Sequence, residues 1–127
     1  MKPTILVIDD DPMVCHHVKL ALSTTQKWET EAVTDSLEGL RRAQESPPQL
    51  IVLDLMMPGM DGLEFLRQLR ADQRTAEIPV LILTARALDD YRQSAAELGA
   101  NAYLTKPYRW SDLMDLVKSL LGEEGSA

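Results

Sequence analysis

Hydrophobic residues gather in five short runs along the chain, and these runs predict β-strands. The first, third and fourth runs are continuously apolar and rich in isoleucine, valine and leucine. That pattern is typical of strands buried on both faces of a parallel sheet. The second run mixes polar with apolar residues, so we expect it nearer an edge of the sheet. In chain order the runs are Ile5–Ile8, Thr30–Val33, Leu50–Leu53, Val80–Leu83 and Ala102–Leu104.

Apolar residues at helical spacing occupy the segments between these runs. The clearest stripe is the last, where apolar residues recur at i, i+3, i+4, i+7 and i+8. Its members are Leu113, Leu116, Val117, Leu120 and Leu121. We predict Ser111 as the N-cap of this helix and Gly122 as its stop. Asp11 followed by Pro12 predicts the start of the first helix. Shorter stripes predict the other helices: Leu37 with Leu40, Phe65 with Leu66 and Leu69, and Tyr91 with Ala95 and Leu98.

Strand and helix therefore alternate five times along the chain. This alternation predicts an α/β domain in which a doubly wound parallel sheet has helices on both faces. The flavodoxin-like strand order 2-1-3-4-5 is one arrangement of five such strands, and periodicity by itself does not choose it. We assign residues 1–122 to this domain and expect residues 123–127 to be a C-terminal tail or the start of a linker.

Composition fits a globular domain, since 45% of the 127 residues are hydrophobic and 26% are charged. The net charge of −7 would repel nucleic acid, so we expect no direct nucleic-acid partner. No apolar stretch approaches the roughly 20 residues of a membrane span, and we expect neither a signal peptide nor a membrane partner. The single cysteine, Cys15, is interpreted as a small helix residue in a reducing compartment. Together these features predict a cytoplasmic protein.

Polar side chains follow four of the predicted strands at the point where each strand ends. They are Asp9, Asp10 and Asp11 after the first strand, Asp54 after the third, Thr84 after the fourth and Lys106 after the fifth. Open α/β sheets bind ligands at this carboxyl edge. Crowded carboxylates repel one another, and a hard divalent cation such as Mg²⁺ relieves that repulsion.

A carboxylate beside such a cation can act as a nucleophile toward phosphorus and form an aspartyl-phosphate. A nearby lysine adds positive charge, and a threonine hydroxyl can donate a hydrogen bond to a phosphoryl oxygen. The adjacent histidines His16 and His17 are no rival metal site, because neighbours on a helix point about 100° apart. The strand ends therefore supply the parts of a phosphoryl-transfer site.

Four segments, each at the end of a predicted strand, carry a family resemblance. They are residues 5–12 (ILVIDDDP), 53–62 (LDLMMPGMDG), 83–85 (LTA) and 99–107 (GANAYLTKP). In order and spacing they resemble the response-regulator receiver domain of two-component signalling, over essentially residues 4–121. The resemblance implies the strand order 2-1-3-4-5. It also implies a phosphorylation-dependent switch that is phosphorylated by a sensor histidine kinase or a histidine phosphotransfer protein, and that catalyses only its own phosphorylation and dephosphorylation.

The resemblance further implies which residues hold the metal and the phosphoryl group. Asp54 matches the phosphoacceptor. Asp9 and Asp10 match the acidic pair that holds Mg²⁺, directly or through water, and the backbone carbonyl of Met56 matches the third protein ligand. We interpret Asp11 as a helix cap and leave it outside the site.

Other positions match the switch and the control of phosphoryl lifetime. Thr84 matches the switch hydroxyl, Tyr103 the switch aromatic, and Lys106 the lysine of the site, whose bond to the following proline is cis in the family. Taken alone, Thr84 fits an ordinary β-branched strand residue equally well, and Tyr103 fits ordinary strand packing. Met56 and Arg86 match positions that flank the path of the hydrolytic water, and their bulk predicts slow self-dephosphorylation.

Signal output is expected at the face formed by the fourth helix, the fifth strand and the last helix. A downstream protein, an output domain or a second copy of this chain would bind there in a phosphorylation-dependent way. The last predicted helix, Asp112–Leu121, has Lys118 as its only basic residue. It therefore lacks the paired arginines associated with DNA-binding regulators that dimerise through the last two helices, which argues against that particular dimer.

Two other classes of protein also use a parallel sheet with polar strand ends. A phosphatase-like hydrolase usually needs an acid two residues after its nucleophile, where this chain has Met56. A flavin-binding or purely structural flavodoxin-like module would want a loop rich in glycine, serine and threonine after the first strand. Here the acidic run Asp9–Asp11 would repel a flavin phosphate. The phosphorylated switch is the interpretation that uses every polar strand end.

Overall fold

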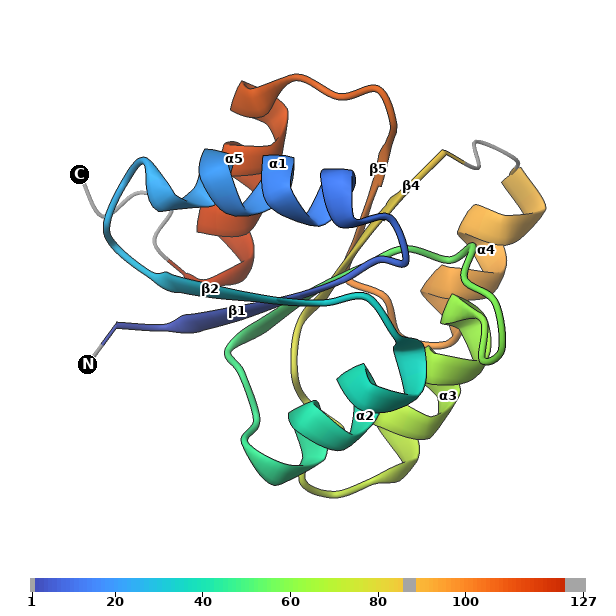
Figure 1. Cartoon of the computed structure of the whole chain (residues 1–127). Helices are drawn as coiled ribbons and strands as arrows, with labels where there is room; N and C mark the ends of the chain where they lie inside the picture. The colour runs from blue at the N-terminus through green and yellow to red at the C-terminus, as the bar shows by residue number, and fades with distance from the viewer. Residues whose placement is uncertain (1, 86–88, 123–127) are drawn as a thin grey trace.

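The computed structural model describes residues 2–85 and 89–122 (Figure 1). Within these residues, parallel strands form one sheet in the order β2-β1-β3-β4-β5, which confirms the predicted flavodoxin-like fold and its strand order. The strands are β1 (Thr4–Ile8), β2 (Glu29–Val33), β3 (Leu50–Leu53), β4 (Val80–Thr84) and β5 (Ala102–Thr105). As expected from its mixed polarity, β2 lies at an edge, and the expected tail, residues 123–127, lies outside the described residues.

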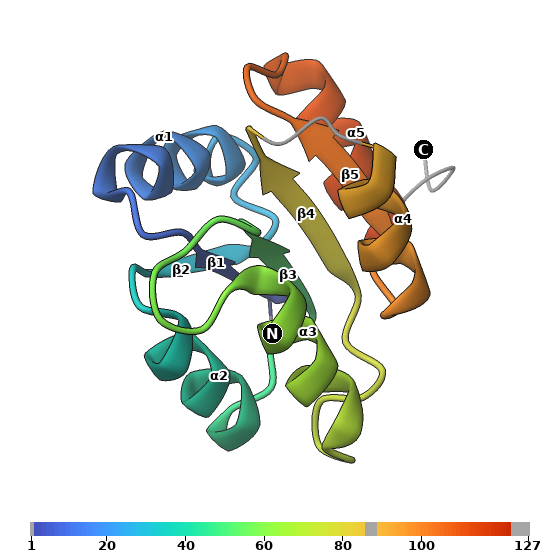
Figure 2. The ribbon, with the colours of Figure 1, turned by 90° about the vertical axis from the view of Figure 1, so that its right-hand side faces the viewer.

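Helices cover both faces of the sheet (Figure 2). On one face lie α1 (Pro12–Ser23) and α5 (Trp110–Leu120); on the other lie α2 (Ser36–Glu45), α3 (Gly62–Ala71) and α4 (Asp89–Glu97). Aspartates cap α1, α2 and α3, because the side chains of Asp11, Asp35 and Asp61 each accept a backbone N–H of the first turn. None of these helices is long and apolar enough to cross a bilayer, as judged over the described residues.

The predicted N-cap of the last helix is wrong. α5 begins at Trp110, so Ser111 lies inside the first turn and Arg109 takes the cap position without a side-chain hydrogen bond. The predicted stop is confirmed, since Gly122 follows the helix with φ of +76°. A positive φ at this place is the usual glycine ending of a helix.

Alternation along the inner strands divides the core into two layers. In β3 all four residues are buried, yet Leu50 and Val52 pack with α1 and α5, whereas Ile51 and Leu53 pack with α2 and α3. Successive side chains of a strand point to opposite faces, so a continuously apolar run is what a sheet covered on both sides requires.

Register brings the carboxyl ends of the strands to a common edge. Leu53, the last residue of β3, pairs with Ile8 of β1 and with Ile82 of β4. Thr84 pairs with Thr105 at the ends of β4 and β5. The residues that follow these strands therefore lie side by side, and this edge carries the candidate site.

Candidate functional site

Three carboxylates cluster where β1 and β3 end. Asp9, Asp10 and Asp54 each offer an oxygen, and these oxygens lie within 4.8 Å of one another. The Asp54 backbone N–H donates to the Ile8 carbonyl at 3.0 Å, which holds the two strand ends together. Asp9 and Asp54 are buried, with 2% and 7% of their surface exposed, whereas Asp10 is exposed. The cluster, called the acidic pocket below, therefore combines two buried carboxylates with one that is open to solvent.

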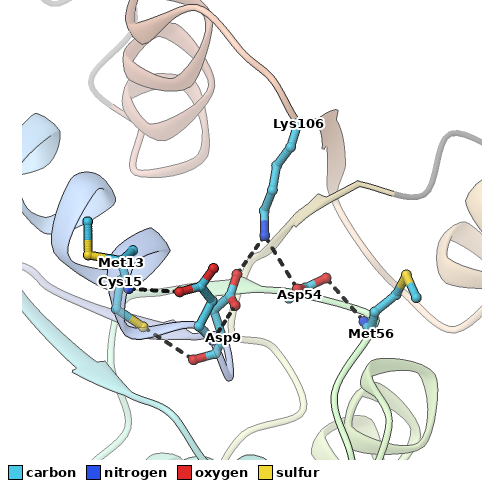
Figure 3. A network of polar contacts seen from close by, with 7 residues as sticks. Asp9, Met13, Cys15, Asp54, Met56 and Lys106 are labelled. Carbon is cyan, nitrogen blue, oxygen red and sulfur yellow. Dashed lines mark hydrogen bonds and ion pairs between the residues drawn. The ribbon is translucent and has the colours of Figure 1, made fainter.

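Lys106 reaches into this pocket from the loop after β5 (Figure 3). Its ammonium donates to Asp9 Oδ2 at 2.8 Å and to Asp54 Oδ2 at 3.4 Å. Its backbone N–H donates to the Thr84 carbonyl at 2.8 Å, which fixes the start of the loop against the end of β4. The bond between Lys106 and Pro107 is cis, as the resemblance implied.

Burial and pairing both act on the charges of this pocket. Burial raises the pKa of the Asp9 carboxyl and outweighs the lowering effect of its hydrogen bonds from Lys106 and from the Asp11 backbone. Burial by itself would lower the pKa of Lys106, but the hydrogen bond to Asp9 and the charges of Asp54 and Asp9 together raise it. Lys106 is thus held as a cation between two carboxylates that repel each other.

Backbone N–H groups orient the two buried carboxylates, and a thiol holds the Asp9 backbone. The Asp11 N–H donates to Asp9 Oδ1 at 2.9 Å, and the Met56 N–H donates to Asp54 Oδ1 at 3.1 Å. The Cys15 thiol donates to the Asp9 carbonyl at 3.3 Å. Burial, with the Asp9 charge second, raises the pKa of Cys15, which keeps this thiol protonated. Asp11 itself caps α1 by accepting the Met13 N–H and is not part of the carboxylate cluster.

The segment after Asp54 is packed more tightly than any pattern in the sequence indicates. The N–H of Gly62 donates to the Leu55 carbonyl at 3.0 Å, closing the loop between β3 and α3. A Cβ at position 62 would lie 2.5 Å from Leu55 Cα and 2.6 Å from the Asp54 carbonyl oxygen. Only glycine permits this approach, so Gly62 positions the backbone that carries the phosphoacceptor candidate.

The remaining candidates lie around this pocket in different ways. Thr84 ends β4 and is fully buried, and Tyr103 is half-buried on β5 with its ring under the Arg92 guanidinium. Met56 has 46% of its surface exposed beside the pocket. Arg86 lies outside the described residues. Pocket and switch candidates thus share one edge of the sheet, with Tyr103 two register pairs before Thr105 along β5.

The donor set fits a hard divalent cation. Carboxylate oxygens are the ligands that Mg²⁺ prefers, and three of them within 4.8 Å of one another suit a single ion. Within the described residues this cluster contains no cysteine or histidine, the ligands that favour zinc or copper. Two residues beyond Asp54, the Met56 side chain offers no group that could donate or accept a proton.

Comparison with known proteins agrees with the family resemblance of the sequence. The family model described as response regulator receiver domain matches residues 5–118. The DNA-binding dual master transcriptional regulator RpaA of Synechocystis is 39% identical over 119 residues, which cover 94% of this chain and 49% of that protein. The transcriptional regulatory protein PrrA of Mycobacterium tuberculosis is 39% identical over 124 residues, covering 98% of this chain and 52% of the other.

A solved structure extends the similarity to the fold. The chemotaxis protein CheY4 of Vibrio cholerae superposes with a TM-score of 0.87 at 27% sequence identity, covering 94% of this chain and 99% of its own. The chain spans about half the length of the curated relatives it matches, and nearly all of this structural neighbour.

Proposed function

The chain belongs to the response-regulator receiver family of two-component signalling, and from that premise we propose that it is a switch whose phosphoryl group is carried on Asp54. The observation that supports this assignment is the position of Asp54. It directly follows the central strand β3, it is buried, and Lys106 bridges it to Asp9. One carboxylate oxygen accepts the Met56 N–H, so the side chain is oriented before any donor arrives.

Mg²⁺ is the cofactor that this pocket fits. Asp9, Asp10 and Asp54 would hold it, together with the Met56 backbone carbonyl that the family resemblance implies. When bound, the ion neutralises negative charge on the transferring phosphoryl group. Asp10, the exposed member of the cluster, is the ligand through which the pocket opens to solvent.

Phosphoryl transfer then follows from what the protein's own groups can do. An Asp54 carboxylate oxygen attacks phosphorus, a new O–P bond forms, and the P–N bond to a phosphorylated histidine of the donor breaks. The ammonium of Lys106, already 3.4 Å from Asp54, can pair with a phosphoryl oxygen. We propose a sensor histidine kinase or a histidine phosphotransfer protein as the donor. The chain then catalyses only its own phosphorylation and dephosphorylation.

The signal is proposed to leave the pocket through Thr84 and Tyr103. Both belong to neighbouring strands, and Tyr103 pairs with Ile82, two residues before Thr84. Side chains two residues apart on a strand share a face, so Thr84 and Tyr103 point to the same side of the sheet. A hydroxyl that moves toward the phosphoryl group would therefore change the space available to this ring. The face formed by α4, β5 and α5 would bind a downstream protein, an output domain or a second copy of the chain.

A direct chemical test uses a small phosphodonor. Incubation with acetyl phosphate and Mg²⁺ should add one phosphoryl group to the protein, read as a single mass increment by intact-mass spectrometry. Asp54→Asn should abolish the increment, because the amide is not a nucleophile toward phosphorus. Asp61→Asn is the matched control, since Asp61 caps α3 in the same loop. Equal labelling of wild type and Asp54→Asn would refute the assignment.

A further inference from the structure

Helix α4 is held to the rest of the domain by few buried side chains. Among its residues, Asp89–Glu97, Ala95 is buried, whereas α3 buries four and α1 buries four. Elements with little buried apolar surface are the ones that shift or open most easily. Each contact between α4 and the sheet therefore contributes a larger share of what holds this helix in place than a similar contact of α1 or α3 does.

One of these contacts joins α4 to the proposed switch residue. The guanidinium carbon of Arg92 lies 4.6 Å from the centroid of the Tyr103 ring. Arg92 is exposed and Tyr103 is half-buried, so the guanidinium covers the ring at the surface. Both residues line a recess between α4, β5 and α5, with Leu104, Thr105, Pro107, Tyr108, Arg109 and Asp112.

The Tyr103 side chain lies on the same face of the sheet as α4, so a movement of its ring affects the contact with Arg92. Tyr103 packs partly against the core layer that contains Ile82 and Ala95, on the face of the sheet that α4 covers. A ring that moves inward toward the end of β4 must leave the guanidinium, which then loses its aromatic partner. Arginine suits this place because its flat cation stacks on an aromatic face, whereas lysine presents a compact, strongly hydrated charge.

We propose that the Arg92–Tyr103 stack is a latch that holds the resting conformation of α4 against β5 and so sets how readily the domain switches. This latch rests on the proposed function, since it opposes the conformation that phosphorylation of Asp54 favours. An exposed cation–π contact of this kind changes the equilibrium between the two conformations by about two- to fivefold. The latch tunes the switch and does not block it.

Linkage makes the proposal measurable with a phosphate mimic. Beryllofluoride with Mg²⁺ binds the active conformation better, so its apparent affinity rises when the resting conformation is weakened. Arg92→Gln should tighten beryllofluoride binding about two- to fivefold. Arg41→Gln, which removes the same charge from an exposed position on α2, is the matched control and should leave the affinity unchanged.

A double-mutant cycle separates the stack from a general charge effect. Tyr103→Phe keeps an aromatic face, so Arg92→Gln should still tighten binding on that background. Tyr103→Leu removes the ring, and Arg92→Gln should then have no further effect. The latch would be overturned if Arg92→Gln bound beryllofluoride no more tightly than Arg41→Gln does. It would also be overturned if Arg92→Gln still tightened binding on the Tyr103→Leu background.

The same titration distinguishes failure of the latch from failure of the proposed function. Wild-type protein that binds no beryllofluoride at the Asp54 pocket would overturn the proposed function and the latch with it. If the wild-type protein binds the mimic and Arg92→Gln binds it with the same affinity, the latch alone would be overturned. Carbon-13 shifts of the Tyr103 ring, measured without any mimic, should move in Arg92→Gln and stay in place in Arg41→Gln; identical ring shifts in both variants would show that no stack exists to be released.

Discussion

The Lys106 ammonium lies 2.8 Å from Asp9 Oδ2, although 97 residues separate the two in the chain. Only 3% of the Asp9 side chain and 20% of the Lys106 side chain are exposed. A carboxylate so deeply buried needs a partner, because an unpaired charge in this place would lose its hydration without compensation. The segments that follow the first and last strands are thus joined by a buried ion pair within the site.

Replacing Lys106 should therefore destabilise the domain when no divalent cation is present. We expect Lys106→Met to lower the free energy of unfolding by about 2 kcal/mol at neutral pH in a chelator. Urea unfolding followed by circular dichroism measures this difference. On an Asp9→Asn background the same substitution should cost much less, since the carboxylate nearest to Lys106 is then uncharged and only Asp54, at 3.4 Å, remains as a charged partner. A cost that is the same on both backgrounds would show that the pair does not stabilise the fold.

The acidic run after β1 should divide into a metal ligand and a helix cap. Asp10→Asn should weaken Mg²⁺ binding by more than roughly tenfold, because it removes a charged ligand of the cluster. Roughly tenfold is the smallest loss expected when only a residue that supports a ligand is changed. Asp10→Asn should nearly abolish phosphorylation as well. Asp11→Asn should affect neither, because asparagine caps a helix about as well as aspartate. Thermal unfolding at increasing Mg²⁺ concentrations measures both affinities.

An equal loss of Mg²⁺ affinity in both variants would contradict this division. The two residues differ in the structure in a simple way. Asp10 belongs to the carboxylate cluster, whereas the Asp11 side chain accepts the Met13 N–H at the start of α1.

Much of the fold was predictable because its determinants are local. The apolar run Leu50–Leu53 predicts a strand buried on both faces, and the structure confirms it. The other strands extend at most one residue beyond their predicted ends at either side. The Ser111 cap failed for the opposite reason, since the start of α5 depends on how the loop after β5 leaves the sheet. Propensity at one residue cannot decide that.

The site was predictable as a set of residues but not as a set of contacts. Strand ends of a parallel sheet must meet at one edge, so Asp9, Asp54 and Lys106 could be brought together from the sequence. Lys106 lies closer to Asp9 than to Asp54, and this difference depends on the path of the loop after β5, which the sequence does not indicate. The stack of Arg92 on Tyr103 depends on how α4 lies over β5, which no periodic pattern encodes.

Phosphoryl lifetime should depend on the side chain of Met56. Its backbone N–H donates to Asp54 Oδ1, and the residue has 46% of its surface exposed next to this carboxylate. A bulky thioether there would keep water from the phosphoryl group, whereas asparagine is smaller and can hydrogen-bond water. Met56→Asn should shorten the half-life of the phosphorylated protein, and adding Arg86→Ala should shorten it further. Loss of the phosphorylated mass after removal of acetyl phosphate measures the half-life.

Leu37→Asn is the control for Met56→Asn. It makes the same kind of change at an exposed apolar residue, with 64% of its surface exposed, on α2 away from the pocket. This control should leave the half-life unchanged. If Met56→Asn left the half-life unchanged or lengthened it, crowding by the thioether would not govern hydrolysis in this protein.

Thr84 should couple the pocket to the distant face without being needed for the pocket itself. It is fully buried at the end of β4 and shares a face of the sheet with Tyr103 on the next strand. Beryllofluoride with Mg²⁺ should shift amide signals around Asp54 and also those of residues 92–98, Tyr103 and residues 113–120. Thr84→Ala should blunt the distant shifts and retain those around Asp54, because the methyl group cannot donate to the mimic while the carboxylates and Lys106 remain. Two-dimensional amide NMR measures both sets of shifts in one titration. Wild-type shifts confined to the pocket would mean that phosphorylation is read out locally, and the face formed by α4, β5 and α5 would then have to be abandoned as the output surface.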